Sequence, residues 1–204
     1  MNILIAAVGG QGALLAARML GNYAHLQGQA VKVSEVHGMS QRGGSVVTHV
    51  RFAERVHSPV IELGHADVLL AFEVLEAARS IEYLREGGIL IVANHRILPL
   101  PVLTGVAEYP QRLLEAFEKM PIATYVVDTS AISGQLGNLK AINTLLVGVL
   151  ARRLSEDPKA WLTAVLDTVP EKHRDLNERA FKLGWNIDFA SHDKLRNQQK
   201  EALA

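Results

Sequence analysis

The chain contains no cysteine among its 204 residues. Iron–sulfur clusters are held by cysteine thiolates, so the chain cannot bind an ordinary cluster by itself. A structural zinc site of the cysteine type and a thiol nucleophile are excluded for the same reason. A protein without disulfide bonds suits the reducing cytoplasm, and we expect it there.

The chain also lacks an excess of charge of either sign, because 21 Lys and Arg residues balance 21 Asp and Glu residues. The chain offers no basic field for a nucleic-acid backbone, so we expect no nucleic-acid partner. It has no apolar run of about 18 residues, the length of a membrane-spanning helix, so we expect no membrane contact. The spacings H-x-H and H-E-x-x-H are absent among its eight histidines, and we expect no metal site. The G-x-S-x-G motif of serine hydrolases and the P-loop motif of NTPases are absent too.

The first 36 residues show the pattern of an α/β unit. Residues 2–8 form an apolar run that ends in glycines, which is typical of a buried parallel strand and too short for a signal peptide. Residues 13–26 carry apolar side chains at helical spacing, Gly28 ends this pattern, and residues 30–36 indicate a second strand. This order of strand, glycine loop, helix and strand opens a doubly wound α/β fold.

The rest of the chain alternates strands and helices before it becomes helical throughout. Strands are predicted at residues 46–52, 67–72, 89–93 and 122–127, and helices at residues 73–85, 110–119, 139–154, from Pro158, and at 171–185. The predicted fold class is α/β, with a Rossmann-like doubly wound mostly parallel sheet and a helical C-terminal third. No repeat or linker divides the sequence, so we predict a single domain over residues 1–190 and a polar C-terminal tail over residues 191–204.

The first candidate site is the glycine loop between the first strand and the first helix, which consists of Gly9, Gly10, Gln11 and Gly12. Unpaired amides at a helix N-terminus favour a phosphate or another anion, and glycines let a ligand approach the backbone. Glu35 lies near the end of the second strand, where dinucleotide-binding proteins keep an acid for the ribose. The fingerprint G-x-G-x-x-G is incomplete, however, because its third glycine would fall at Leu15. A tight turn that simply needs glycine and a site for an anion or nucleotide-like ligand both remain open.

The second candidate site is a polar loop that follows the second strand. Besides Glu35 just before it, the loop comprises His37, Gly38, Met39, Ser40, Gln41, Arg42, Gly43, Gly44 and Ser45. Open α/β sheets place their ligands at the carboxyl ends of strands, as here. Arg42 could bind a carboxylate or phosphate through two hydrogen bonds, and His37 could transfer protons near neutral pH, which makes it a candidate catalytic residue. Contact with a ligand, contact with another subunit, and a merely solvated loop are three open interpretations.

The two loops together carry a resemblance to a known family. Residues 8–12 read V-G-G-Q-G, and residues 34–46 read S-E-V-H-G-M-S-Q-R-G-G-S-V. These two motifs resemble those of the gamma-domain family of 2-oxoacid:ferredoxin oxidoreductases, and within that family they are most similar to the motifs of the beta subunits of the indolepyruvate type. Weaker similarities follow at residues 138–148, which include Asn143, and at residues 177–184, which include Ala180 and Phe181.

The resemblance implies that the chain is the small subunit of a complex. Such complexes oxidatively decarboxylate a 2-oxoacid, here an indolepyruvate or arylpyruvate, to an acyl-CoA and pass the electrons to ferredoxin. The resemblance also implies that a larger subunit carries the thiamine diphosphate and the iron–sulfur clusters, that this chain alone holds no cofactor, and that it is inactive alone. The glycine loop would then meet an anion such as a phosphate of coenzyme A, and residues 35–45 would face the substrate or the partner subunit.

Two other functions compete with this interpretation. The chain could be a stand-alone nucleotide-binding oxidoreductase, which the incomplete fingerprint at Leu15 disfavours. It could instead be a non-catalytic interaction module, with the apolar stretch at residues 139–150 as an interface rather than as core. Loss of a partner would expose an apolar surface, so a homodimer of the isolated chain is also expected.

Overall fold

A computed structural model describes residues 1–38, 43–129, 141–155 and 157–189 of the chain. Three predicted site residues, Ser40, Gln41 and Arg42, lie outside the described residues, together with Met39 and the predicted tail at residues 191–204. Within the described ranges, none of the helices is both long enough and apolar enough to cross a membrane.

Six strands form one mixed sheet in the order β2-β3-β1-β4-β5-β6. Their bounds are Asn2–Val8 for β1, Ala30–His37 for β2, Ser45–Ala53 for β3, Ala66–Ala71 for β4, Leu84–Ala93 for β5 and Ala123–Val127 for β6. The pairs β1–β4, β4–β5 and β5–β6 are parallel. Strand β3 lies between β1 and β2 and runs antiparallel to both. The mostly parallel sheet is therefore confirmed, with a β2–β3 hairpin added at one edge.

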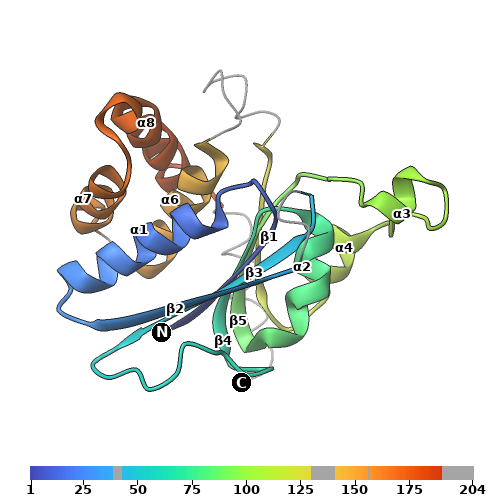
Figure 1. Ribbon diagram of the computed structural model, residues 1–204, viewed down its shortest axis with the longest axis horizontal. Coiled ribbons are helices and arrows are strands. Elements are labelled where there is room, and N and C mark those ends of the chain that lie inside the picture. The colour runs from blue at the N-terminus through green and yellow to red at the C-terminus, as the bar shows by residue number, and fades with distance from the viewer. Residues whose placement is uncertain (39–42, 130–140, 156, 190–204) are drawn as a thin grey trace.

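Helices cover both faces of this sheet, as a doubly wound fold requires (Figure 1). The covering helices are α1 (Ala13–Leu26), α2 (Val74–Ser80), α4 (Leu113–Glu118), α6 (Ile142–Leu154), α7 (Lys159–Thr168) and α8 (Arg174–Trp185), whereas the short helix α3 (Leu100–Leu103) lies apart from the sheet. Helices α1, α6, α7 and α8 share one apolar core with Ile3 and Ile5 of β1. Helices α2 and α4 share a second core with Leu4 and Ala6 of the same strand. Strand β1 is thus buried on both faces, which explains why its apolar run does not alternate with polar residues.

The predicted helix at residues 73–85 is wrong in its second half. Helix α2 ends at Ser80, a short 3-10 turn follows at Ile81–Tyr83, and β5 already begins at Leu84. The glycine pair that suggested a helix stop lies inside β5, where Gly87 has a φ of 66° and the pairing with β4 shifts its register. Glycine at such an irregularity in a strand gives the same sequence signal as glycine after a helix.

The helical C-terminal third packs through two glycines where α6 crosses α8. A Cβ atom on Gly148 would lie 2.3 Å from the carbonyl oxygen of Phe181, and one on Gly184 would lie 2.0 Å from that of Leu145. All residues from Asn143 to Ala151 are buried. The described part of the apolar stretch at residues 139–150 is therefore core, which contradicts its interpretation as an interface.

Burial of His49 on β3 makes the stability of the fold depend on pH. The ring is buried, its Nδ1 accepts a hydrogen bond of 3.2 Å from the backbone N–H of Ile61, and the ring of Tyr83 meets it edge to face. Burial lowers the pKa of His49 below its ordinary value of 6.5. The unfolded chain therefore binds this proton more readily than the folded chain does.

We expect the free energy of unfolding to be highest above pH 6.5 and to fall as the pH drops through 6.5 toward the lower pKa of the folded state. In the His49→Gln variant, the side-chain oxygen can still accept the hydrogen bond from Ile61, but the amide does not titrate. The free energy of unfolding of this variant should therefore change less over this pH interval than that of the wild type. Urea unfolding at a series of pH values measures both profiles. Equal slopes for the two proteins below pH 6.5 would contradict the assignment to His49.

Candidate functional site

The two predicted loops lie side by side at the carboxyl edge of the sheet. Gly9 donates its backbone N–H to the carbonyl of Gly44 at 2.8 Å, and Gly43 donates to the carbonyl of Gly9 at 3.2 Å. Val8 at the end of β1 pairs with Ser45 at the start of β3. The antiparallel position of β3 brings about this contact, because the β2–β3 hairpin returns the second loop to the end of β1.

Glycine is favoured at position 12 of the first loop for two separate reasons. Gly12 has a φ of 86°, in the left-handed region, and a Cβ there would lie 2.6 Å from Nδ2 of Asn143. Asn143 donates from Nδ2 to the carbonyl of Gly12 at 3.3 Å and so ties α6 to the start of α1. Gly12 is also the N-cap of α1 and supplies no side-chain cap. The first turn of α1 therefore begins with backbone amides that no capping side chain satisfies.

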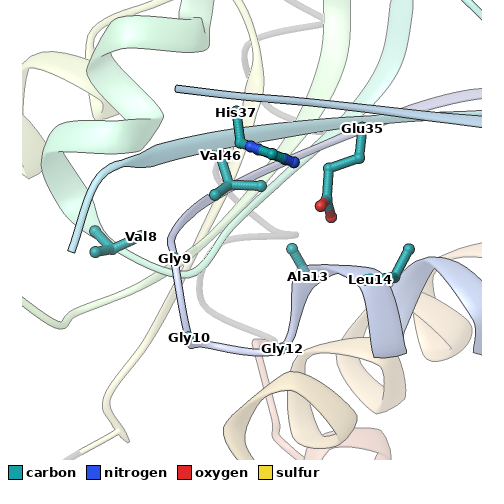
Figure 2. A pocket seen from close by; sticks show the side chains of 9 residues that line it. All are labelled: Val8, Gly9, Gly10, Gly12, Ala13, Leu14, Glu35, His37 and Val46. Atoms are coloured by element: carbon teal, nitrogen blue, oxygen red, sulfur yellow. The ribbon is translucent and has the colours of Figure 1, made fainter. Parts of the chain in front are cut away.

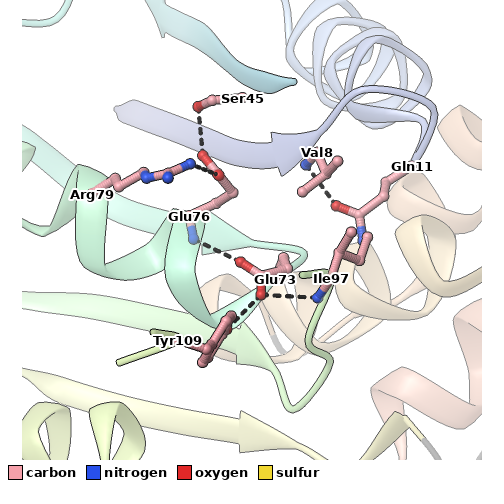
Figure 3. A network of polar contacts seen from close by, with 8 residues as sticks. All are labelled: Val8, Gln11, Ser45, Glu73, Glu76, Arg79, Ile97 and Tyr109. Carbon is pink, nitrogen blue, oxygen red and sulfur yellow. Dashed lines mark hydrogen bonds and ion pairs between the residues drawn. The ribbon is translucent and has the colours of Figure 1, made fainter. Parts of the chain in front are cut away.

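The side chain of Gln11 joins the ends of two strands. Its Oε1 accepts a hydrogen bond of 2.7 Å from the backbone N–H of Val8, and its Nε2 donates to the carbonyl of Phe72 at 3.0 Å. The first of these bonds is drawn in Figure 3. Both polar atoms of the Gln11 amide thus bond to backbone at the ends of β1 and β4. The structure places Gln11 as the residue that holds the glycine loop in position.

A cavity of about 350 Å³ separates the glycine loop from β2. Figure 2 shows the Glu35 carboxylate directed toward the first turn of α1, with the His37 ring beside it. Glu35 accepts a hydrogen bond of 3.3 Å from the hydroxyl of Thr48, and Nδ1 of His37 lies 3.1 Å from the carbonyl of Gly38. A carboxylate in this cavity repels anions and attracts groups that donate hydrogen bonds. Glu35 and His37 are therefore brought together with the glycine loop around one cavity.

A second cavity, of about 450 Å³, lies on the opposite side of the same loop. It is lined by Gly10, Gln11, Gly12, Leu15, Phe72, His95, Ile97, Ile142 and Asn143. None of these described lining residues is acidic, and most of the side chains are apolar. An anion at the start of α1 meets less repulsion on this side than beside Glu35. The sequence did not single out His95, since it lies in no recognisable motif.

Two buried acids, Glu73 at the N-cap of α2 and Glu76 in its first turn, form a polar network below the second loop (Figure 3). Glu73 is fully buried and accepts hydrogen bonds from the backbone N–H of Glu76 at 2.8 Å, the N–H of Ile97 at 3.2 Å and the Tyr109 hydroxyl at 2.6 Å. Burial and the bond to Glu73 raise the pKa of Tyr109 well above its ordinary value, so its hydroxyl stays protonated and donates. The network was missed in the sequence, where Glu73 and Glu76 resemble ordinary residues of a first helical turn.

Glu76 connects this network to the second loop. Its carboxylate accepts a hydrogen bond of 2.5 Å from the hydroxyl of Ser45 and a charged one of 2.6 Å from Arg79. Ser45 is the last residue of the predicted loop site, so one end of the loop is anchored on a buried carboxylate. This anchoring gives Ser45 a positioning role.

Comparison with known proteins supports the resemblance carried by the two loops. Residues 2–187 match the model of the family described as pyruvate ferredoxin/flavodoxin oxidoreductase. The indolepyruvate oxidoreductase subunit IorB of Thermococcus kodakarensis is 40% identical, over 90% of this chain and 93% of that protein.

Two solved structures are similar in fold. The gamma subunit of a keto/oxoacid ferredoxin oxidoreductase from Geobacter sulfurreducens has a TM-score of 0.66 at 23% identity, covering 90% of this chain and 95% of that one. The 2-oxoglutarate:ferredoxin oxidoreductase of Magnetococcus marinus, solved with 2-oxoglutarate, coenzyme A and succinyl-CoA, has a TM-score of 0.68 at 16% identity. The match covers 91% of this chain but 30% of that longer one. With the family model spanning almost the whole sequence, the chain belongs to the pyruvate ferredoxin/flavodoxin oxidoreductase family.

Proposed function

We propose that this chain is the small subunit of an indolepyruvate-type 2-oxoacid:ferredoxin oxidoreductase. The observation that carries the proposal is the 40% identity to a subunit of indolepyruvate oxidoreductase over nearly the full length of both chains. The complex oxidatively decarboxylates an indolepyruvate or related arylpyruvate to the acyl-CoA, with ferredoxin as the electron acceptor. We place the complex in the cytoplasm.

The donor atoms of this chain do not suit the redox cofactors of such a complex. The sequence holds no cysteine for an iron–sulfur cluster. Within the described ranges, no group of three or more His, Asp or Glu side chains could hold a metal ion. We therefore assign the thiamine diphosphate and the clusters to a larger partner subunit, and this chain alone is expected to be inactive.

The part of the reaction that we propose for this chain is contact with coenzyme A, whose thiol takes up the acyl group. Gly9, Gly10, Gln11 and Gly12 would offer the loop and the first turn of α1 to a phosphate. The cavity beside His95 suits this role better than the one beside Glu35, because its lining has no carboxylate to repel a phosphate. Glu35 and His37 then face the substrate or the partner subunit from the other side of the loop.

Co-expression with the thiamine diphosphate and cluster-binding subunit encoded in the same genome tests the proposal. We expect a stable complex that reduces a redox dye only when both an arylpyruvate and coenzyme A are present. The isolated chain should be colourless, should show no 2-oxoacid oxidation, and is expected to self-associate. If the larger subunit alone reduced the dye as fast as the complex does, the proposal would be contradicted.

Amide hydrogen exchange on the assembled complex tests the coenzyme A contact separately. Addition of coenzyme A should slow exchange at residues 10–15, whereas residues 60–65 at the opposite edge of the sheet serve as the control. Unchanged exchange at both segments would remove coenzyme A from this loop but leave the subunit assignment intact. NAD-dependent oxidation by the isolated chain would instead favour a stand-alone nucleotide-binding enzyme. The sequence argues against such an enzyme, because Leu15 occupies the position of the third glycine in the dinucleotide-binding fingerprint.

A further inference from the structure

The segment between β5 and α4 projects from the body of the molecule and carries exposed apolar side chains. We call residues 96–108 the apolar arm; it contains α3, which stands apart from both helical layers in Figure 1. Exposure of its side chains reaches 72% at Leu100, 66% at Leu103 and 82% at Val106. Only its two ends bear charge, at Arg96 and Glu108. Such side chains in water are unfavourable unless another surface covers them.

The apolar arm holds its shape by bonds within itself. The carbonyl of Pro101 accepts from the backbone N–H groups of Val106 at 2.9 Å and Ala107 at 3.0 Å, and that of Pro99 accepts from Val102 at 2.9 Å. The two prolines also restrict their own backbone angles. The backbone is thus closed on itself while the leucines point outward. Little further ordering is needed for the arm to bind a partner, which favours affinity.

Both ends of the apolar arm are fixed to one buried oxygen. Ile97 and Tyr109 each donate to Oε1 of Glu73, at 3.2 and 2.6 Å. The guanidinium of Arg96 lies 5.6 Å from the centre of the Tyr109 ring. Glu73 caps α2, and Glu76 in the same helix accepts the hydrogen bond from Ser45 at the end of the second loop. A partner on the arm therefore lies at the same edge of the sheet as both loops and both cavities.

We propose that the apolar arm is a docking surface for the larger subunit of the same oxidoreductase complex; the proposal rests on the function proposed above. Between its two charged ends the apolar arm is uncharged and largely apolar, which is the chemistry of permanent interfaces, since these are more apolar than transient ones. Its position next to the two loops places the larger subunit against the cavities where the chemistry is expected. The same fold makes up 30% of one longer chain in the 2-oxoglutarate:ferredoxin oxidoreductase, so there it is joined to a larger body.

The double variant Leu100→Asp/Leu103→Asp tests the docking surface. Its control is Leu26→Asp/Leu63→Asp, which makes the same chemical change at two exposed leucines on the opposite edge of the sheet. Thermal unfolding should be nearly the same for wild type and both variants, because all four side chains are exposed. We expect the arm variant to bind the purified larger subunit at least about tenfold more weakly than wild type, and the control to bind normally. Equal binding by both variants, while wild type assembles, would overturn the arm proposal and leave the proposed function standing.

A labelling experiment covers the case in which the aspartate variants fold poorly. Because the chain has no cysteine, Val106→Cys and Leu63→Cys each introduce one unique thiol whose modification mass spectrometry can follow on this subunit. Assembly with the larger subunit should protect Cys at position 106 and leave position 63 reactive. Protection of position 106 in the isolated chain at high concentration, with none on assembly, would show that a second copy covers the arm and would overturn the proposal. Failure of the wild-type chain to bind any larger subunit would count against the proposed function itself.

Discussion

Gly184→Ala is expected to destabilise the chain by about 3–5 kcal/mol, a large part of the stability of an ordinary domain. The added methyl carbon would lie 2.0 Å from the carbonyl oxygen of Leu145 and 2.9 Å from its carbonyl carbon. These atoms belong to the backbone of α6, so no side-chain rotation relieves the collision, and the two helices have to separate. Gly148→Ala meets the backbone of α8 in the same way and should have a similar effect.

Gly21→Ala is the matched control for this prediction. Gly21 also lies inside a helix, α1, but a Cβ there meets nothing within 4 Å. Alanine at this position should stabilise the chain by about 0.5–1 kcal/mol, because alanine is the better helix former. Urea unfolding of the three variants measures the difference. A loss below about 1 kcal/mol for Gly184→Ala would mean that α6 and α8 are not in backbone contact.

Glu73→Gln is expected to cost about 2–4 kcal/mol, although it changes a single atom. Both carboxylate oxygens of Glu73 accept, one from Glu76 and the other from Ile97 and Tyr109. An amide has one oxygen, so its NH₂ group must face a backbone N–H on one side or the other. The site is fully buried, and water cannot replace the lost acceptor.

Glu82→Gln makes the same change at an exposed position and should alter the free energy of unfolding by less than about 0.5 kcal/mol. Tyr109→Phe removes one of the three donors and should lie between the two. This series can be followed by chemical unfolding at pH 7. If Glu73→Gln and Glu82→Gln were equally stable, the buried network on α2 would not hold the base of the apolar arm.

Local sequence patterns were sufficient to predict the first α/β unit and the position of the two loops at strand ends. The apolar run of β1, the glycine turn and the spacing of α1 gave the first α/β unit, and two loops at strand ends gave the candidate site. The position of β3 could not be predicted, because a hairpin and a crossover connection begin with the same kind of polar glycine loop. The error at residues 84–88 has a similar cause, since Gly87 and Gly88 mark a strand irregularity and a helix end equally well.

The buried acids could not be predicted either, because their partners are distant in the sequence. Tyr109 is 36 residues from Glu73, and Ser45 is 31 residues from Glu76. Nothing near either glutamate indicates that a hydroxyl will meet it. The same holds for Gly148 and Gly184, whose importance depends on how α6 crosses α8. The similarity to family sequences at residues 138–148 and 177–184 pointed to these regions, and the helix crossing now gives the similarity a physical reason.

Titration of the purified chain into its purified larger subunit tests the subunit assignment most directly. The rate of ferredoxin reduction is measured with indolepyruvate and saturating coenzyme A at each addition. We predict no reduction by the chain alone, and a rate that rises with added chain to a plateau in the presence of the larger subunit. Oxidation of a 2-oxoacid by the chain alone, or a rate that its addition leaves unchanged, would contradict the assignment.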